Sequence, residues 1–157
     1  GADQNPKKIK RQRATVNIET TRFGKIEIDE TRVIDFPEGL LGFPEQKRYV
    51  LLEHRPDSPF CWLQSVDQPE LAFVLTNPFL VDKNYLKDLS PGETALLGGK
   101  KGDLVTVFAL VTIPPGQVEK MTVNLIGPLI IEADTRTGRQ VVLPNSGYSH
   151  NQPFPMN

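Results

Sequence analysis

The stretch F-C-W-L-Q-S-V-D-Q-P-E-L-A-F-V-L-T-N-P-F, Phe60–Phe79, carries the strongest fold signal in this chain. Its two apolar runs, Phe60–Val66 and Leu71–Leu75, each have the length of a buried strand and are rich in aromatic and branched residues. The polar break Asp67–Glu70 separates them with turn-forming residues. We therefore expect a central β-hairpin that other strands close over.

Further short apolar runs lie on both sides of this hairpin, bounded by Gly, Pro or Asn. The other predicted strands are Thr15–Thr20, Lys25–Asp29, Arg32–Phe36, Arg48–Glu53, Asp103–Ile113, Met121–Ile126, Pro128–Ala133 and Arg139–Leu143. Ser90, Pro91 and Glu93 predict the start of one short helix, with Ser as its N-cap. About nine short strands and one short helix indicate a mainly β fold, either an antiparallel barrel or a rolled sheet.

The length of 157 residues suits one domain, which we place at residues 15–143. Residues 1–14 carry five basic side chains against Asp3, a net charge of +4, which leaves −5 for the rest of the chain. This basic tail lacks apolar periodicity, so we expect it to be disordered and solvated, with nucleic-acid contact as the alternative. Residues 144–157 are rich in Pro, Asn and Ser and predict an extended C-terminal tail.

The residue types needed for catalysis or metal binding are sparse and scattered. The two histidines, His54 and His150, lie in a turn and in the C-terminal tail, far from any Cys or His partner in sequence. The single cysteine, Cys61, lies between Phe60 and Trp62 in an apolar run, which favours a buried, unreactive thiol. We therefore expect no enzyme activity, no metal and no cofactor. A lone thiol, with no hydrophobic N-terminal segment and no stretch long enough to span a membrane, predicts a cytoplasmic protein.

The loop P-E-G-L-L-G-F-P, residues 37–44, combines two prolines and two glycines with three large apolar residues. Such a loop can plug the end of a barrel or form an exposed binding patch, and different residues can do each. The predicted strands carry few basic or aromatic residues in alternation, so we do not expect direct nucleic-acid binding by the domain. We therefore expect a protein-binding module. Its candidate surfaces are the 37–44 loop, the segment 78–89 and any open sheet edge that could accept a strand.

Four motifs together resemble one known family. They are I-D-F-P-E-G-L-L-G-F-P (34–44), S-P-F-C-W-L-Q-S-V (58–66), P-E-L-A-F-V-L-T-N-P (69–78) and N-L-I-G-P-L-I-I (124–131). In this combination and order the chain is similar to the flagellar assembly factor FliW family, from about Arg22 to Leu143. The resemblance implies a mainly β, barrel-like fold without catalysis.

The resemblance also implies two protein partners in bacterial flagellum biogenesis. FliW proteins bind the translational regulator CsrA and antagonise it allosterically, which relieves repression of flagellin mRNA. They also bind flagellin, in a feedback loop with some chaperone character. The residues that we expect to meet a partner are Glu38, Leu40, Leu41, Pro78 and Phe79. A purely structural role for these residues is the alternative, and a single-stranded-RNA-binding β-barrel is the alternative function.

Overall fold

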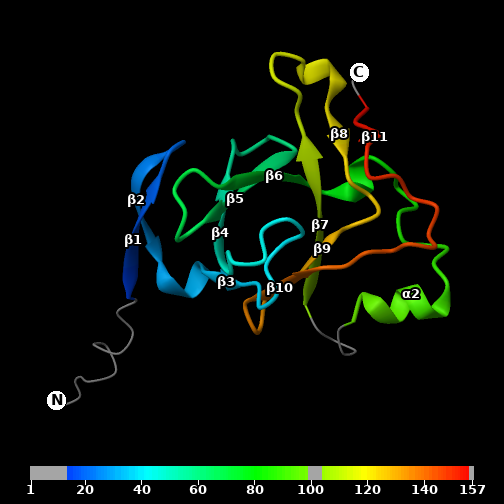
Figure 1. Ribbon diagram of the computed structural model, residues 1–157, viewed down its shortest axis with the longest axis horizontal. Helices are drawn as coiled ribbons and strands as arrows, with labels where there is room; N and C mark the ends of the chain where they lie inside the picture. The colour runs from blue at the N-terminus through cyan, green and yellow to red at the C-terminus, as the bar shows by residue number, and fades with distance from the viewer. Residues whose placement is uncertain (1–13, 99–103, 156–157) are drawn as a thin grey trace.

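The hairpin predicted at the centre of the chain is present in the computed structural model, which describes residues 14–98 and 104–155 (Figure 1). Strands β5 (Phe60–Ser65) and β6 (Ala72–Thr76) pair antiparallel, with Trp62 opposite Val74. The turn between them bonds Leu71 N–H to the Gln68 carbonyl at 3.0 Å. The predicted disorder of the tail 1–14 lies outside the described residues, apart from Ala14.

The remaining elements surround this hairpin. They are β1 (Thr15–Thr20), β2 (Gly24–Asp29), η1 (Glu30–Arg32), β3 (Ile34–Asp35), β4 (Arg48–Glu53), η2 (Pro78–Leu80), α2 (Pro91–Leu96), β7 (Val105–Thr112), η3 (Val118–Lys120), β8 (Thr122–Val123), β9 (Leu129–Glu132), β10 (Thr137–Gln140) and β11 (Gln152–Pro153). The helix α2 begins as predicted, because the Ser90 side chain accepts a hydrogen bond from Glu93 N–H at 3.2 Å.

The sheet closes into a barrel through the long strand β7. One edge of β7 pairs with β6, and the other edge pairs with β9 over Val105–Phe108 and with β8 at Val111 and Thr112. The closed ring therefore runs β7-β6-β5-β4-β3-β10-β9 and back to β7. The prediction of a mainly β, barrel-like fold is confirmed. Closure pairs most strand edges of the ring, although β3 and β10 meet at a single residue pair.

Several strands are shorter than predicted, and three of them differ most from the prediction. The stretch expected as Arg32–Phe36 pairs only over β3, because Glu30–Arg32 form a 3-10 turn whose N-cap, Asp29, accepts from Thr31 N–H. Of the strand predicted at Met121–Ile126, only the part in β8 is formed. The strand predicted at Arg139–Leu143 lies nearer the N-terminus, at β10. Beyond β10 the chain still bonds to its neighbour, since Val141 N–H donates to the Pro128 carbonyl at 2.9 Å.

The described part of the expected C-terminal tail, residues 144–155, packs on the barrel. Its strand β11 pairs with β8, and Phe154 lies against Phe60 with ring centroids 5.3 Å apart. Tyr148 lies against Tyr85 at 4.8 Å, and its hydroxyl accepts from Leu86 N–H at 2.7 Å. This segment thus covers an apolar face that the barrel strands alone leave open.

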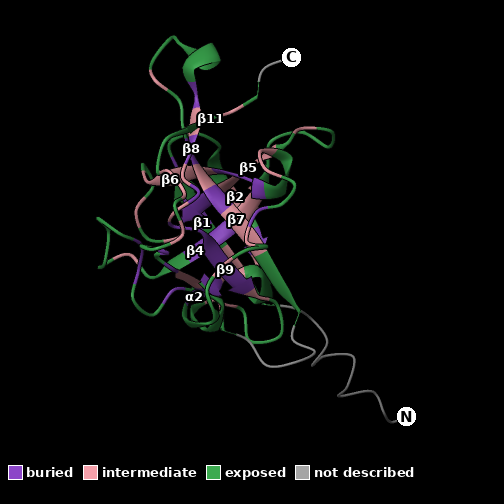
Figure 2. Ribbon diagram, turned by 90° about the vertical axis from the view of Figure 1, so that its right-hand side faces the viewer, coloured by how far each residue is buried: buried purple, intermediate pink, exposed green. Residues whose placement is uncertain are grey.

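Two main clusters of buried residues follow from this arrangement (Figure 2). The first fills the barrel and includes Phe36, Tyr49 and Leu63, each with no exposed surface. The second lies between β7, β8 and the segment around Tyr85. The β1–β2 hairpin packs separately on β4 through Ile18, Ile28 and Val50. Burial of these apolar groups is the main stabilising contribution to the fold.

Candidate functional site

The loop 37–44 closes one end of the barrel, and its path is set by the backbone. Phe36 N–H donates to the Lys47 carbonyl at 2.7 Å, and Gly39 N–H donates back to the Phe36 carbonyl at 2.8 Å. Gly39 has a φ of +64°, and a Cβ there would lie 2.5 Å from the Phe43 carbonyl oxygen. Only glycine combines this positive φ with the absence of a Cβ, so Gly39 permits the tight turn that begins the loop.

Two adjacent leucines of this loop have opposite environments. Leu40 is 3% exposed and packs in the barrel core, whereas Leu41 is 65% exposed. Phe43 is 39% exposed, with its ring 5.3 Å from that of Phe73. Both interpretations of the loop therefore hold for different residues: Leu40 plugs the barrel, and Leu41 is presented to solvent.

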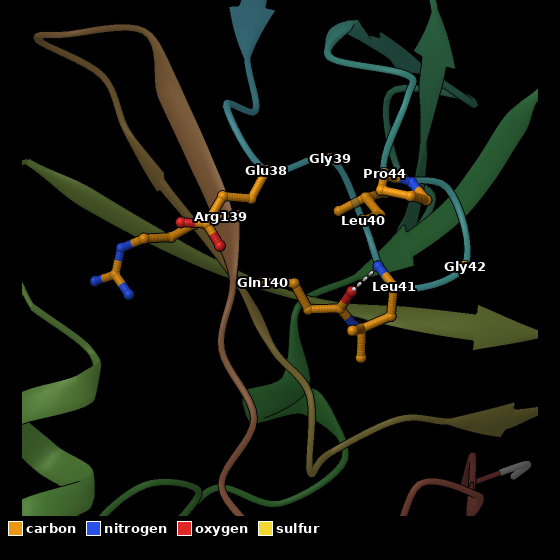
Figure 3. Close-up of a pocket in the computed structure, with 8 residues that line it drawn as sticks. All are labelled: Glu38, Gly39, Leu40, Leu41, Gly42, Pro44, Arg139 and Gln140. Carbon is orange, nitrogen blue, oxygen red and sulfur yellow. Dashed lines mark hydrogen bonds between the residues drawn. The ribbon is translucent and has the colours of Figure 1, made fainter.

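The loop is fastened to β10 by one side chain (Figure 3). The Gln140 carboxamide oxygen accepts from Leu41 N–H at 3.0 Å, and its nitrogen donates to the Gly127 carbonyl at 3.0 Å. Both ends of the carboxamide are thereby used. Gln140 holds the backbone of Leu41 in place and leaves the leucine side chain free.

Two shallow hollows adjoin this loop on its β10 side. The first has a volume of about 280 Å³ and is lined by Glu38, Gly39, Leu40, Leu41, Gly42, Pro44, Arg139 and Gln140. The second has a volume of about 200 Å³ and is lined by Pro37, Glu38, Glu132, Thr137, Gly138 and Arg139. Because Glu38 and Arg139 line both, the two hollows are neighbours, and we call them together the β10 hollow.

The β10 hollow is lined by two carboxylates and one arginine, and that arginine bonds to another element of the fold. The Arg139 guanidinium donates to the Leu96 carbonyl at 2.7 Å and to the Leu97 carbonyl, at the C-terminal end of α2. A cation at that position satisfies carbonyls that the short helix leaves without partners. Within residues 14–98 and 104–155, the carboxylates of Glu38 and Glu132 have no ion-pair partner. With two carboxylates and one guanidinium, the lining carries a formal net charge of −1 beside an exposed leucine, and neither carboxylate is held in an ion pair.

The five residues expected to meet a partner separate into three kinds. Glu38 and Leu41 are exposed and line the β10 hollow, whereas Leu40 lines it from the buried side. Pro78 is buried on η2 and serves as part of the core. Phe79 is 41% exposed and packs edge-on against Tyr85 at 5.7 Å, away from the β10 hollow. The structure brings together the three loop residues and leaves η2 as a separate surface.

Three residues of the hollow were not predicted from the sequence. Glu132, Arg139 and Gln140 lie in ordinary-looking strands about 90 to 100 positions after the loop, and they reach it only because β10 pairs with β3. The parallel contact of β10 with β3 is a single residue pair, Thr137 with Asp35. No local motif marks such a contact.

Three groups whose pKa values are raised by burial lie in the barrel core or in the second apolar cluster. Burial raises the pKa of Tyr49 to about 12 and that of the Cys61 thiol to about 11. Burial also raises the pKa of Tyr85, whose hydroxyl donates to the Leu125 carbonyl at 2.6 Å. None of these three lines the β10 hollow. Their shifts follow from packing, and the hollow itself offers carboxylates and apolar surface suited to binding.

Two further observations concern the described residues only. No group of three or more His, Cys, Asp or Glu side chains within them is arranged to hold a metal ion. No helix among them is long and apolar enough to cross a membrane.

The Cys61 thiol provides a first prediction. Since only the thiolate reacts with iodoacetamide, a pKa of about 11 should make alkylation at pH 8 slow in the folded protein. We expect the rate to be about 100-fold lower than in the urea-unfolded chain, in which the pKa returns to its ordinary range. Mass spectrometry of timed samples measures both rates. Equal rates in the two states would contradict the packing of Cys61 against the barrel core.

The fold and the site together define a class: a closed seven-stranded β-barrel domain with an acidic hollow beside a loop that plugs the barrel end. The family model described as FliW protein matches residues 17–154. The flagellar assembly factor FliW of Natranaerobius thermophilus is 40% identical over 139 residues, which cover 88% of this chain and 92% of that protein. Its counterpart in Geobacter sulfurreducens is 41% identical, over 88% of this chain and 86% of that protein.

A solved structure agrees with the sequence relatives. The crystal structure of a flagellar assembly factor FliW superposes with a TM-score of 0.77 at 35% identity, covering 89% of this chain and 98% of that one. The chain therefore belongs to the FliW family of flagellar assembly factors, as the four motifs predicted. The match extends past β10 and includes the segment that carries β11.

Proposed function

We propose that this chain acts in the cytoplasm by binding the translational regulator CsrA and antagonising it allosterically, which relieves repression of flagellin mRNA. It also binds flagellin, and this second partner withdraws it from CsrA and closes a feedback loop. It makes and breaks no covalent bond. Family membership supports this function, and the β10 hollow is the observation that carries it for this chain.

The charge of the hollow favours a protein partner over RNA. The carboxylates of Glu38 and Glu132, which outnumber the one arginine of the lining, repel phosphates and attract the Lys and Arg side chains of a basic RNA-binding protein. The exposed Leu41 beside them supplies apolar surface that a protein interface can bury. The net charge of −5 outside residues 1–14 has the same sign as the hollow and steers a basic partner towards it.

The alternative function, single-stranded RNA binding, has one surface feature in its favour. The Arg22 guanidinium carbon lies 4.1 Å from the centre of the Trp62 ring, and Phe23 and His54 also pack on that ring. Aromatic and cationic groups of this kind stack with bases in RNA-binding modules. Here, however, Arg22 already occupies the face of Trp62, and a base would have to displace it.

A gel-shift experiment with flagellin leader RNA distinguishes the two functions. The chain alone should give no shift, and it should reverse the shift that CsrA produces. Because an allosteric antagonist lowers RNA affinity by a finite factor, the loss of affinity should reach a limit as the chain concentration is raised, and added flagellin should restore the CsrA shift. A shift by the chain alone would favour the RNA-binding alternative, and an unchanged CsrA shift would contradict the proposal.

A further inference from the structure

One edge of β10 is unpaired over most of its length. Val141 N–H donates to the Pro128 carbonyl, on the β9 side of the ladder, at 2.9 Å. Main-chain groups alternate between the two edges of a strand, so the N–H and C=O of Gln140 point away from β9. On that side β3 pairs only at Asp35 with Thr137. Among the described residues, no strand continues this edge past Thr137.

The chain leaves β10 at this point to form the plug loop. After Asp35, Phe36 turns to bond with Lys47 rather than with β10. The first part of the β10 hollow lies in the resulting gap, with residues 38–42 on one side and Arg139 and Gln140 on the other. The barrel wall is therefore incomplete here, and the gap is bordered by a strand edge that can accept main-chain hydrogen bonds.

The size and lining of the hollow indicate what the gap can hold. Volumes of about 280 and 200 Å³ lie below the range typical of drug-sized ligand sites, which begins near 300 Å³. Each part is better suited to one side chain. The exposed Leu41 lines the first part, and Glu38 and Glu132 both line the second. An aliphatic and a cationic side chain complement these two linings.

We propose that an extended segment of the basic partner adds to the β10 edge and places two alternate side chains in the β10 hollow. One is aliphatic and packs on Leu41, and the other is a Lys or Arg held between Glu38 and Glu132. Residues two apart in an extended segment face the same side, about 7 Å apart, so two alternate side chains can enter two adjacent hollows. In strand addition of this kind, main-chain hydrogen bonds supply the affinity and alternate side chains supply the specificity. The inference rests on the proposed function, in which that partner is CsrA.

Charge reversal tests the proposal against a matched control. The double variant Glu38→Lys/Glu132→Lys should weaken CsrA binding, measured by calorimetry, at least 10-fold with an unchanged melting temperature. The control Glu53→Lys/Glu119→Lys changes two exposed carboxylates outside the hollow and alters the net charge equally. Glu119 lies on η3, at the tip of the projecting β7–β8 hairpin (Figure 1). The control should weaken binding less than 3-fold, through the loss of long-range steering alone.

Hydrogen exchange tests the main-chain part. In complex with CsrA, the amide of Gln140 should exchange at least 10-fold more slowly, because it gains an acceptor at the open edge. Unchanged exchange there, or equal effects of the two double variants, would overturn the proposal while leaving the proposed function intact. Loss of flagellin binding with CsrA binding retained would also overturn it, since the occupant would then be the other partner. Failure of the unchanged chain to bind CsrA would overturn both.

Discussion

Replacing Phe36 with alanine is expected to lower the free energy of unfolding by about 3–5 kcal/mol, a large part of the stability of a domain of this size. Phe36 has no exposed surface, and its ring lies edge-on to Tyr49 at 5.3 Å in the barrel core. The truncation loses this burial and leaves a cavity beneath the plug loop. Urea unfolding followed by Trp62 fluorescence measures the change.

A double-mutant cycle measures the contact between the Phe36 ring and Gly138. A Cβ added at Gly138 would lie 2.5 Å from the tip of the Phe36 ring, so Gly138→Ala alone should cost about 1–3 kcal/mol through overpacking. In the Phe36→Ala background the added methyl group enters the cavity, and that cost should vanish. The control Gly92→Ala, with open space around its Cβ position, should be neutral or slightly stabilising. Additive effects of the Phe36 and Gly138 substitutions would contradict this packing.

The individual strands of this fold can be predicted from short stretches of sequence, whereas the pairings that close the barrel cannot. The bounds of β4 and of the β5–β6 hairpin follow from apolar runs and the turn residues between them, so they could be predicted. The pairing of β7 with β9 and the parallel pair of β3 with β10 join segments that no motif connects. Pairing partners depend on which faces bury each other, a property of the whole chain.

The candidate site shows the same division. The composition of the 37–44 loop indicates both a plug and a patch, and the sequence does not say which leucine serves which role. That choice depends on Gly39, whose positive φ turns the chain so that Leu40 points inward. The availability of the Glu38 carboxylate depends on Arg139, whose guanidinium bonds to the carbonyls at the end of α2 and forms no ion pair with Glu38. Such tertiary contacts cannot be read from residue types.

Replacing Leu41 with aspartate is expected to weaken CsrA binding about 100-fold while the fold remains intact. Leu41 is 65% exposed, and its main-chain bond to Gln140 does not depend on the leucine side chain. A surface substitution of this kind changes stability by less than about 0.5 kcal/mol, which shifts the melting temperature of a domain this size by about 2 °C at most. An apolar residue at the centre of an interface contributes about 2–4 kcal/mol to binding. Calorimetry and thermal unfolding of the same samples give both quantities.

The sign of the introduced charge strengthens the Leu41→Asp experiment. A further carboxylate beside Glu38 and Glu132 attracts a basic partner more strongly, so any loss of affinity must come from the lost apolar contact. The affinity of the neutral variant Leu41→Asn for CsrA should therefore exceed that of Leu41→Asp by no more than a few-fold. Val118→Asp, at a residue 53% exposed on η3, adds the same charge to a similarly exposed apolar position and should retain wild-type affinity. If Leu41→Asp instead unfolded the protein, Leu41 would belong with Leu40 to the plug, and the β10 hollow would lose its apolar contact.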